Sequence, residues 1–176
     1  MSADVVTQLA EQLEWHWTQQ LRPRLDGLSD EEYFWQPVPH CSTVHPDGGI
    51  DFAHPPPRPD PVTTIAWRLA HVIVGVFGAR THDHFGGPPA DYSTWPYATT
   101  AATALAQLDV AYAGWSAGVR GLTDDDLWTP CGPAEGGYAD APMAALVLHI
   151  NREVIHHGAE IALLRDLYVH THQKEN

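Results

Sequence analysis

The sequence is poor in positive charge and in cysteine. It has 9 Lys and Arg residues against 22 Asp and Glu residues, which gives a formal net charge of −13. Nucleic-acid binding depends on clustered Lys and Arg side chains that contact phosphates, so this balance argues against a nucleic-acid partner. The two cysteines, Cys41 and Cys131, lie in Pro- and Gly-rich segments without a CxxC spacing, which favours a reduced, cytoplasmic protein.

Long apolar runs are missing as well. No uncharged stretch is long enough to cross a bilayer, and the sequence does not start with a basic segment followed by an apolar one. We therefore expect neither membrane insertion nor secretion. There is also no strand pattern, internal repeat or glycine-rich phosphate loop. At 176 residues, we expect one domain, residues 1–176, with a substantial core.

The pattern that is present is helical. Apolar residues recur at steps of three and four along four segments, which predict long helices over about 3–25, 61–82, 99–122 and 141–168. Loops rich in proline and glycine separate these segments. Four helices that each have an apolar face predict an all-α four-helix bundle. The long loops before and after the second helix permit a crossover connection.

The apolar stripe of the last predicted helix is interrupted by two polar residues. The stripe reaches Ile150, continues at Glu153 and His157, and becomes apolar again at Ile161. A lone carboxylate in a core costs several kcal/mol unless a partner neutralises it. A bound metal ion is such a partner, and the i, i+4 spacing lets both side chains reach one ion.

A third ligand is expected from the second helix. Catalytic zinc sites use three protein ligands and leave one position for water or substrate. His71 lies in the most apolar stretch of the sequence, so we predict that it joins Glu153 and His157 at the ion. A core histidine satisfied by hydrogen bonds is the other interpretation of His71. A buried hydrogen-bonded cluster of all three residues without an ion is the structural alternative.

The sequence leaves the roles of three further residues of the last helix undecided. His149 precedes Glu153 by four residues, but ligands at i, i+4 and i+8 span ~12 Å, too far for one ion. His156 replaces His157 if the helix is rotated by part of a turn. Glu160 is either an acceptor for the N–H of a ligand histidine or a solvent-facing charge.

Three segments resemble the DinB-like (YfiT-like) superfamily of four-helix bundles. They are Leu25–Pro37, Ile65–His71 and Glu153–Ile161, and the last two are the specific ones. The metal triad of that family has one histidine on the second long helix and two ligands at i, i+4 on the last helix. By this resemblance the triad falls on His71, Glu153 and His157.

The sequence departs from the commonest form of that motif. Many members carry His-x-x-x-His-Arg-Gly-Gln on the last helix, whereas here Glu153 takes the first ligand position and Gly158-Ala159-Glu160 follows the second. The glutamate form is similar to the branch related to mycothiol-dependent maleylpyruvate isomerase. That resemblance implies Zn2+ and a low-molecular-weight thiol such as mycothiol, although the mixed ligands at Glu153 and His157 also suit Ni2+, Fe2+ or Mn2+.

The resemblance implies a metal-dependent enzyme that acts on a small molecule. The expected activity is a thiol-dependent transferase or isomerase reaction on a small electrophile, with metal-dependent hydrolysis as a further reaction class. Metal-bound water or thiolate, rather than a protein side chain, is the expected nucleophile. A non-catalytic, metal-stabilised ligand-binding or stress-response module is the alternative. Loop aromatics such as Tyr33, Trp95 and Tyr97 are candidates for the mouth of the site, and a homodimer is common for such bundles.

Overall fold

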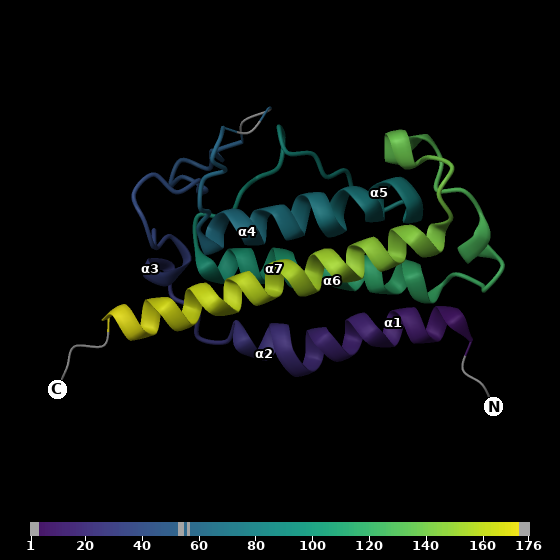
Figure 1. Ribbon diagram of the computed structural model, residues 1–176, viewed down its shortest axis with the longest axis horizontal. Coiled ribbons are helices and arrows are strands. Elements are labelled where there is room, and N and C mark those ends of the chain that lie inside the picture. The colour runs from purple at the N-terminus through teal and green to yellow at the C-terminus, as the bar shows by residue number, and fades with distance from the viewer. Residues whose placement is uncertain (1–3, 53–54, 56, 173–176) are drawn as a thin grey trace.

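The protein is an all-α four-helix bundle, as the periodicity predicts (Figure 1). The computed structural model describes residues 4–52, 55 and 57–172. Over these residues the ordered elements are helices, and the only pairing between extended segments is in isolated β-bridges. Within the same residues, every helix is either too short or too polar to cross a lipid bilayer.

Each of the first two long helices is built from three segments. The first long helix comprises α1 (Val5–His16), η1 (Trp17–Leu21) and α2 (Arg22–Arg24), and the second comprises α4 (Ile65–His71), η2 (Val72–Gly78) and α5 (Ala79–Phe85). The segments η1 and η2 are π-helical, where continuous α-helix is expected from the sequence. The expected start of the first helix at residue 3 lies outside the described residues. The second starts at Ile65 because the Thr64 side chain caps it by accepting from the Trp67 N–H.

The remaining helices include one that runs the length of the molecule. The third long helix is α6 (Ala101–Arg120), and the fourth is α7 (Met143–His172), which continues past its expected end near residue 168. The short elements are α3 (Asp30–Tyr33), η3 (Asp126–Trp128) and η4 (Pro133–Tyr138). The side chain of Ser29 caps α3 by accepting from the N–H of Glu32, whose carboxylate pairs with Arg165 of α7 at 2.6 Å.

The segment between α5 and α6 is a crossover, so the second and third long helices run in the same direction (Figure 1). Phe85 ends α5 and packs against Trp115 near the end of α6, with ring centroids 5.3 Å apart. At the other end of the bundle, the Tyr33 hydroxyl donates to the Ala98 carbonyl just before α6 begins. The loop of residues 86–100 therefore runs back along the bundle, a path that its length permits.

The core lies along the line where the long helices meet. Its largest fully buried side chains come from all parts of the bundle and include Leu25, Leu69, Ile73, Phe77, Leu108, Trp115, Ile150 and Ile161. Each such side chain contributes ~1.5–3 kcal/mol by leaving water. Because α7 packs antiparallel to α4, this burial also brings the middle of α7 next to the end of α4, where His71 lies.

Candidate metal centre

His71, Glu153 and His157 converge between α4 and α7. Each offers one ligand atom, and these atoms all lie within 4.8 Å of one another. Nε2 of His157 is 3.6 Å from Oε2 of Glu153. The rings of His71 and His157 have centroids 4.7 Å apart and are nearly perpendicular, at 86°. The structure therefore brings together the three residues that the interrupted stripe indicates.

Helix geometry explains this convergence. Glu153 and His157 are one turn apart on α7, and the apolar residues that flank them on the same face, Ile150 and Ile161, are each 1% exposed. His157 is buried, while the side chain of Glu153 remains 24% exposed. His71 reaches the same point from the last turn of α4. The carboxylate is thus at the edge of the core, where it can face both an ion and solvent.

The crossover segment also contacts His71. The Tyr92 hydroxyl lies 2.6 Å from Nδ1 of His71, which leaves Nε2 as the free ring nitrogen. Gly75 makes this contact feasible, because a Cβ at that position would lie 2.0 Å from the Tyr92 hydroxyl. Gly75 is in the centre of the π-helical segment η2, a feature often found at functional sites.

A carboxylate holds the second histidine in the same manner. Oε2 of Glu160 is 2.8 Å from Nδ1 of His157, so the Nε2 atom of that ring is directed to Glu153. Glu160 also pairs with Arg68 of α4, whose side chain is 18% exposed. Of the two roles considered for Glu160, the structure shows the acceptor for a histidine N–H. A carboxylate behind a histidine is the usual outer shell of a metal site.

Burial keeps both imidazoles neutral near pH 7. Desolvation, assisted by the nearby His157, lowers the pKa of His71 to about 4. Desolvation also lowers the pKa of His157, against the opposing effect of Glu160. Metal binding requires histidine without a proton on the ligating nitrogen, so these rings need no deprotonation to accept an ion.

Two other histidines of α7, His149 and His156, are less well placed. His156 forms a second group with His157 and Glu160, but its side chain is 60% exposed, and Glu160 is already paired with Arg68. His149 is 3.5 Å from Oε1 of Glu153, and its ring also contacts Arg152. His149 does not belong to either group of converging ligand atoms found in the described part of the chain.

A groove of 710 Å³ reaches one of the three residues, His157. Its walls include His157 and Arg68, together with Trp67 and Phe52. The Trp67 indole donates to the Asp51 carbonyl at 2.7 Å, and the Phe52 ring stacks on Tyr92 with centroids 4.8 Å apart. A cavity of small-molecule size with aromatic walls therefore adjoins His157.

The aromatic residues expected at the mouth lie elsewhere. Tyr33 is 1% exposed, the Tyr97 hydroxyl donates to the carbonyl of Tyr92 at 2.7 Å, and Trp95 lines a different pocket. Trp67 and Phe52 line the groove instead, and Tyr92 contacts His71. Its position in a loop without periodicity offered no signal for this role.

A second pocket, of 620 Å³, is lined by two neighbours of Glu153. Its walls include His149 and Arg152, which lie 3.5 Å and 3.4 Å from Oε1 of Glu153. Arg80, another lining residue, is paired with Glu135, and the half-buried Cys131 also lines the pocket.

Comparison with known proteins gives one match. A family model described as the DinB superfamily matches residues 12–161, which contain the three converging residues. No match was found among curated proteins or among solved structures.

Proposed function

This chain belongs to the DinB superfamily, and from that premise we propose that it binds a divalent metal ion, zinc, through His71, Glu153 and His157. The observation that carries this proposal is the convergence of the three ligand atoms within 4.8 Å. The hydrogen bonds of the two histidines support the proposal. Tyr92 contacts Nδ1 of His71 and Glu160 contacts Nδ1 of His157, so the Nε2 atom of each ring is free to bind an ion.

The donor set fits zinc. Two neutral imidazoles and one carboxylate are a known catalytic combination, and they leave a fourth position for an exogenous ligand. Donor atoms around a tetrahedral zinc ion lie ~3–3.6 Å apart, and the His157–Glu153 pair already meets this spacing at 3.6 Å. The partly exposed Glu153 side chain has room for the remaining adjustment.

We propose that the activity is a low-molecular-weight-thiol-dependent transfer or isomerisation of a small electrophile. A bound zinc ion would stabilise a thiol as its thiolate at neutral pH. The chain itself offers no suitable thiol among the described residues of the groove, because Cys41 is buried with its Sγ bonded to the Val38 carbonyl and Cys131 lines the second pocket. Trp67 and Phe52 would hold the organic part of a substrate, and mycothiol is the thiol implied by the resemblance of the glutamate form to the mycothiol-dependent branch.

Metal content and turnover test this proposal together. Purified protein should hold about one zinc ion per chain, and Glu153→Gln should lose it. With mycothiol and 1-chloro-2,4-dinitrobenzene as substrates, wild type should form the conjugate faster than buffer does, and Glu153→Gln should not. Glu11→Gln, a substitution at an exposed position of α1, is the matched control. A wild-type protein without stoichiometric metal would end the metal proposal.

The alternative is a metal-stabilised module without turnover. It is favoured by the fact that the converging residues come from two helices, α4 and α7, so an ion between them would link the bundle. In that case chelation lowers the melting temperature, and no thiol and electrophile pair is converted. The cytoplasmic location and the homodimer belong to the same proposal and are tested by localisation and by light scattering.

A further inference from the structure

The segment η4 covers the second pocket, the one of 620 Å³, and lies beside α5 outside the four long helices (Figure 1). The lining residues that come from η4 are Ala134, Glu135, Gly136 and Tyr138. The other lining residues include Arg80 of α5 and His149 and Arg152 of α7. A molecule in this pocket is therefore next to the two neighbours of Glu153, and the position of η4 determines whether it can enter.

Apolar burial does not hold η4 in place. None of its residues is buried, and its largest side chain, Tyr138, is 77% exposed. The Gly132 N–H donates to the Ala139 carbonyl at 2.9 Å, and the Cys131 N–H donates to the Ala141 carbonyl at 2.8 Å. These hydrogen bonds close the base of the loop but do not attach η4 to the helices. Segments with few buried apolar contacts are those that open locally in native proteins.

One side chain attaches η4 to the helices. Glu135 is the only residue of η4 whose side chain forms hydrogen bonds or ion pairs within the described part of the chain. Its carboxylate lies 2.9 Å from Nε2 of His84 and 3.3 Å from Nη2 of Arg80, both on α5. The side chain of Glu135 is 8% exposed and that of His84 is 5% exposed. The cost of burying these charges offsets much of their attraction, so the attachment is specific but modest in free energy.

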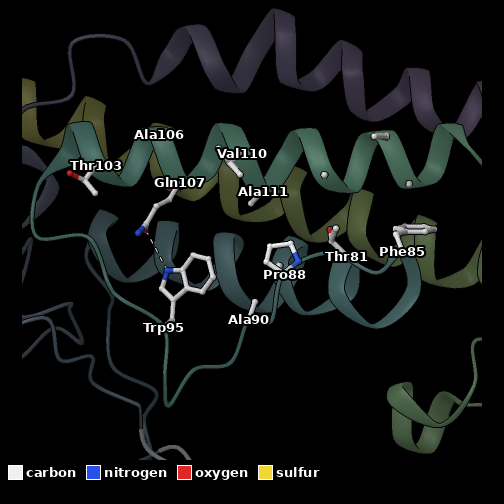
Figure 2. A pocket seen from close by; sticks show the side chains of 15 residues that line it. Thr81, Phe85, Pro88, Ala90, Trp95, Thr103, Ala106, Gln107, Val110 and Ala111 are labelled. Carbon is white, nitrogen blue, oxygen red and sulfur yellow. Dashed lines mark hydrogen bonds between the residues drawn. The ribbon is translucent and has the colours of Figure 1, made fainter.

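The helix α5 is a fixed support for this attachment. Its residues Thr81 and Phe85 point toward α6 (Figure 2). The Phe85 ring packs against Trp115, and a Cβ at Gly118 of α6 would lie 2.1 Å from that ring. Because α5 is packed this closely against the bundle, we expect η4 to move, and α5 to stay, when the contacts of Glu135 break.

Glycines on both sides of Glu135 leave the backbone free to change direction. Gly132 and Gly136 have positive φ angles of 88° and 55°, and a Cβ at either position would meet no atom within 4 Å. Glycine moves between left-handed and other conformations more readily than any other residue. These two positions are therefore suited to act as hinges.

We propose that η4 is a lid over the second pocket and that Glu135 is the latch of this lid. The lid is closed while the Glu135 carboxylate contacts His84 and Arg80. When these contacts break, η4 turns at Gly132 and Gly136, and the pocket opens to molecules that approach α7 on the side of Arg152. The lid is a property of the chain itself and does not depend on a bound metal.

Amide hydrogen exchange of the metal-free protein tests the lid. In wild type the amides of η4 should exchange faster than those in the centres of α5 and α7. Glu135→Gln keeps the shape of the side chain but removes its charge, and it should raise exchange in η4 about tenfold and leave both helices unchanged. Asp140→Asn, at an exposed position of the same loop, is the matched control and should have no effect. Equal exchange of η4 in the three proteins, or an equal rise in η4 and both helices, would overturn the proposal.

Alkylation of Cys131 tests access to the pocket that this residue lines. Cys41, which is buried with its Sγ bonded to the Val38 carbonyl, is the internal control. Glu135→Gln also changes the thiol itself, because burial and, to a smaller extent, Glu135 raise the pKa of Cys131. That effect acts on all maleimides alike, so the informative quantity is the rate with bulky N-(1-pyrenyl)maleimide divided by the rate with N-ethylmaleimide. This ratio should rise about fivefold in Glu135→Gln and stay constant in Asp140→Asn. An unchanged ratio in Glu135→Gln would show that Glu135 does not control access, and the proposal is then wrong.

Discussion

The hydroxyl group of Tyr92 lies 2.6 Å from Nδ1 of His71, although the two residues come from different elements of the bundle. When Nε2 binds an ion, Nδ1 carries the ring proton, and this N–H donates a hydrogen bond to the Tyr92 oxygen. This contact defines both the tautomer and the orientation of the ring. Tyr92 therefore acts on the proposed metal centre through His71.

Tyr92→Phe should weaken zinc binding about tenfold, because the ring of His71 loses the partner that orients it. The melting temperature of the metal-free protein should change little, since the aromatic ring is retained. Competition with a zinc-selective chelator measures the affinity. Tyr138→Phe, at a tyrosine that is 77% exposed, is the control. Equal zinc affinity of Tyr92→Phe and wild type would show that the hydrogen bond has no role in metal binding.

Gly75→Ala should produce the same defect by a steric route. Its Cβ would lie 2.0 Å from the Tyr92 hydroxyl, so Tyr92 must move away from His71. We expect a loss of zinc affinity of about tenfold, as for Tyr92→Phe, and no further loss when both changes are combined. The matched control is Gly137→Ala, where a Cβ meets no atom within 4 Å. Additive effects of the two changes would mean that Gly75 acts through something other than Tyr92.

Glu160→Ala should affect both zinc affinity and stability. His157 loses the acceptor that orients it, which should weaken zinc binding about tenfold or more. Arg68, which is largely buried, loses its ion-pair partner, and unfolding of the metal-free protein should become easier by about 1–3 kcal/mol.

A second substitution separates these two effects. Adding Arg68→Met to Glu160→Ala should restore much of the stability, because no unpaired charge remains, but should not restore zinc affinity. Glu14→Ala removes another interhelical pair, with Arg120, whose members are 49% and 42% exposed, and should cost under about 1 kcal/mol. Recovery of zinc affinity in the double variant would refute an orienting role for Glu160.

The bundle and the three converging residues follow from local spacing. Apolar residues at steps of three and four define one face of each helix, and the polar residues Glu153 and His157 on such a face must meet something in the core. His71 stands out because it too is a polar residue within an apolar helical stretch. The direction of the third helix cannot be predicted from this spacing, because a long loop permits a crossover but does not require one.

The partners of the ligands could be predicted only in part. Glu160 lies three residues after His157, so its proximity to that ring is a property of the helix itself, and its acceptor role was one of two considered. Tyr92 follows His71 by 21 residues and reaches it only through the path of the crossover segment. That path depends on tertiary contacts such as the clearance at Gly75, which no periodic pattern encodes.

Tyr97 anchors the segment that carries Tyr92, and this contact predicts a loss of stability at high pH. Its hydroxyl donates to the Tyr92 carbonyl at 2.7 Å, and burial, with a smaller effect of Asp91, raises the pKa of Tyr97 to about 12. The unfolded chain releases this proton near pH 10. The hydroxyl therefore stabilises the fold fully below about pH 10, and this contribution falls by about 2–3 kcal/mol as the pH rises to 12.

Comparison with Tyr97→Phe isolates this effect, because all other titrations occur in both proteins. Below about pH 9 the variant should be less stable than wild type by about 1 kcal/mol, the contribution of one hydrogen bond. Near pH 12 the order should reverse, since only wild type has a phenol at position 97, whose ionisation favours the unfolded chain. Denaturant unfolding of the metal-free proteins at both pH values measures the difference. A difference that does not change with pH would show that the Tyr97 hydroxyl titrates alike in the folded and unfolded chains.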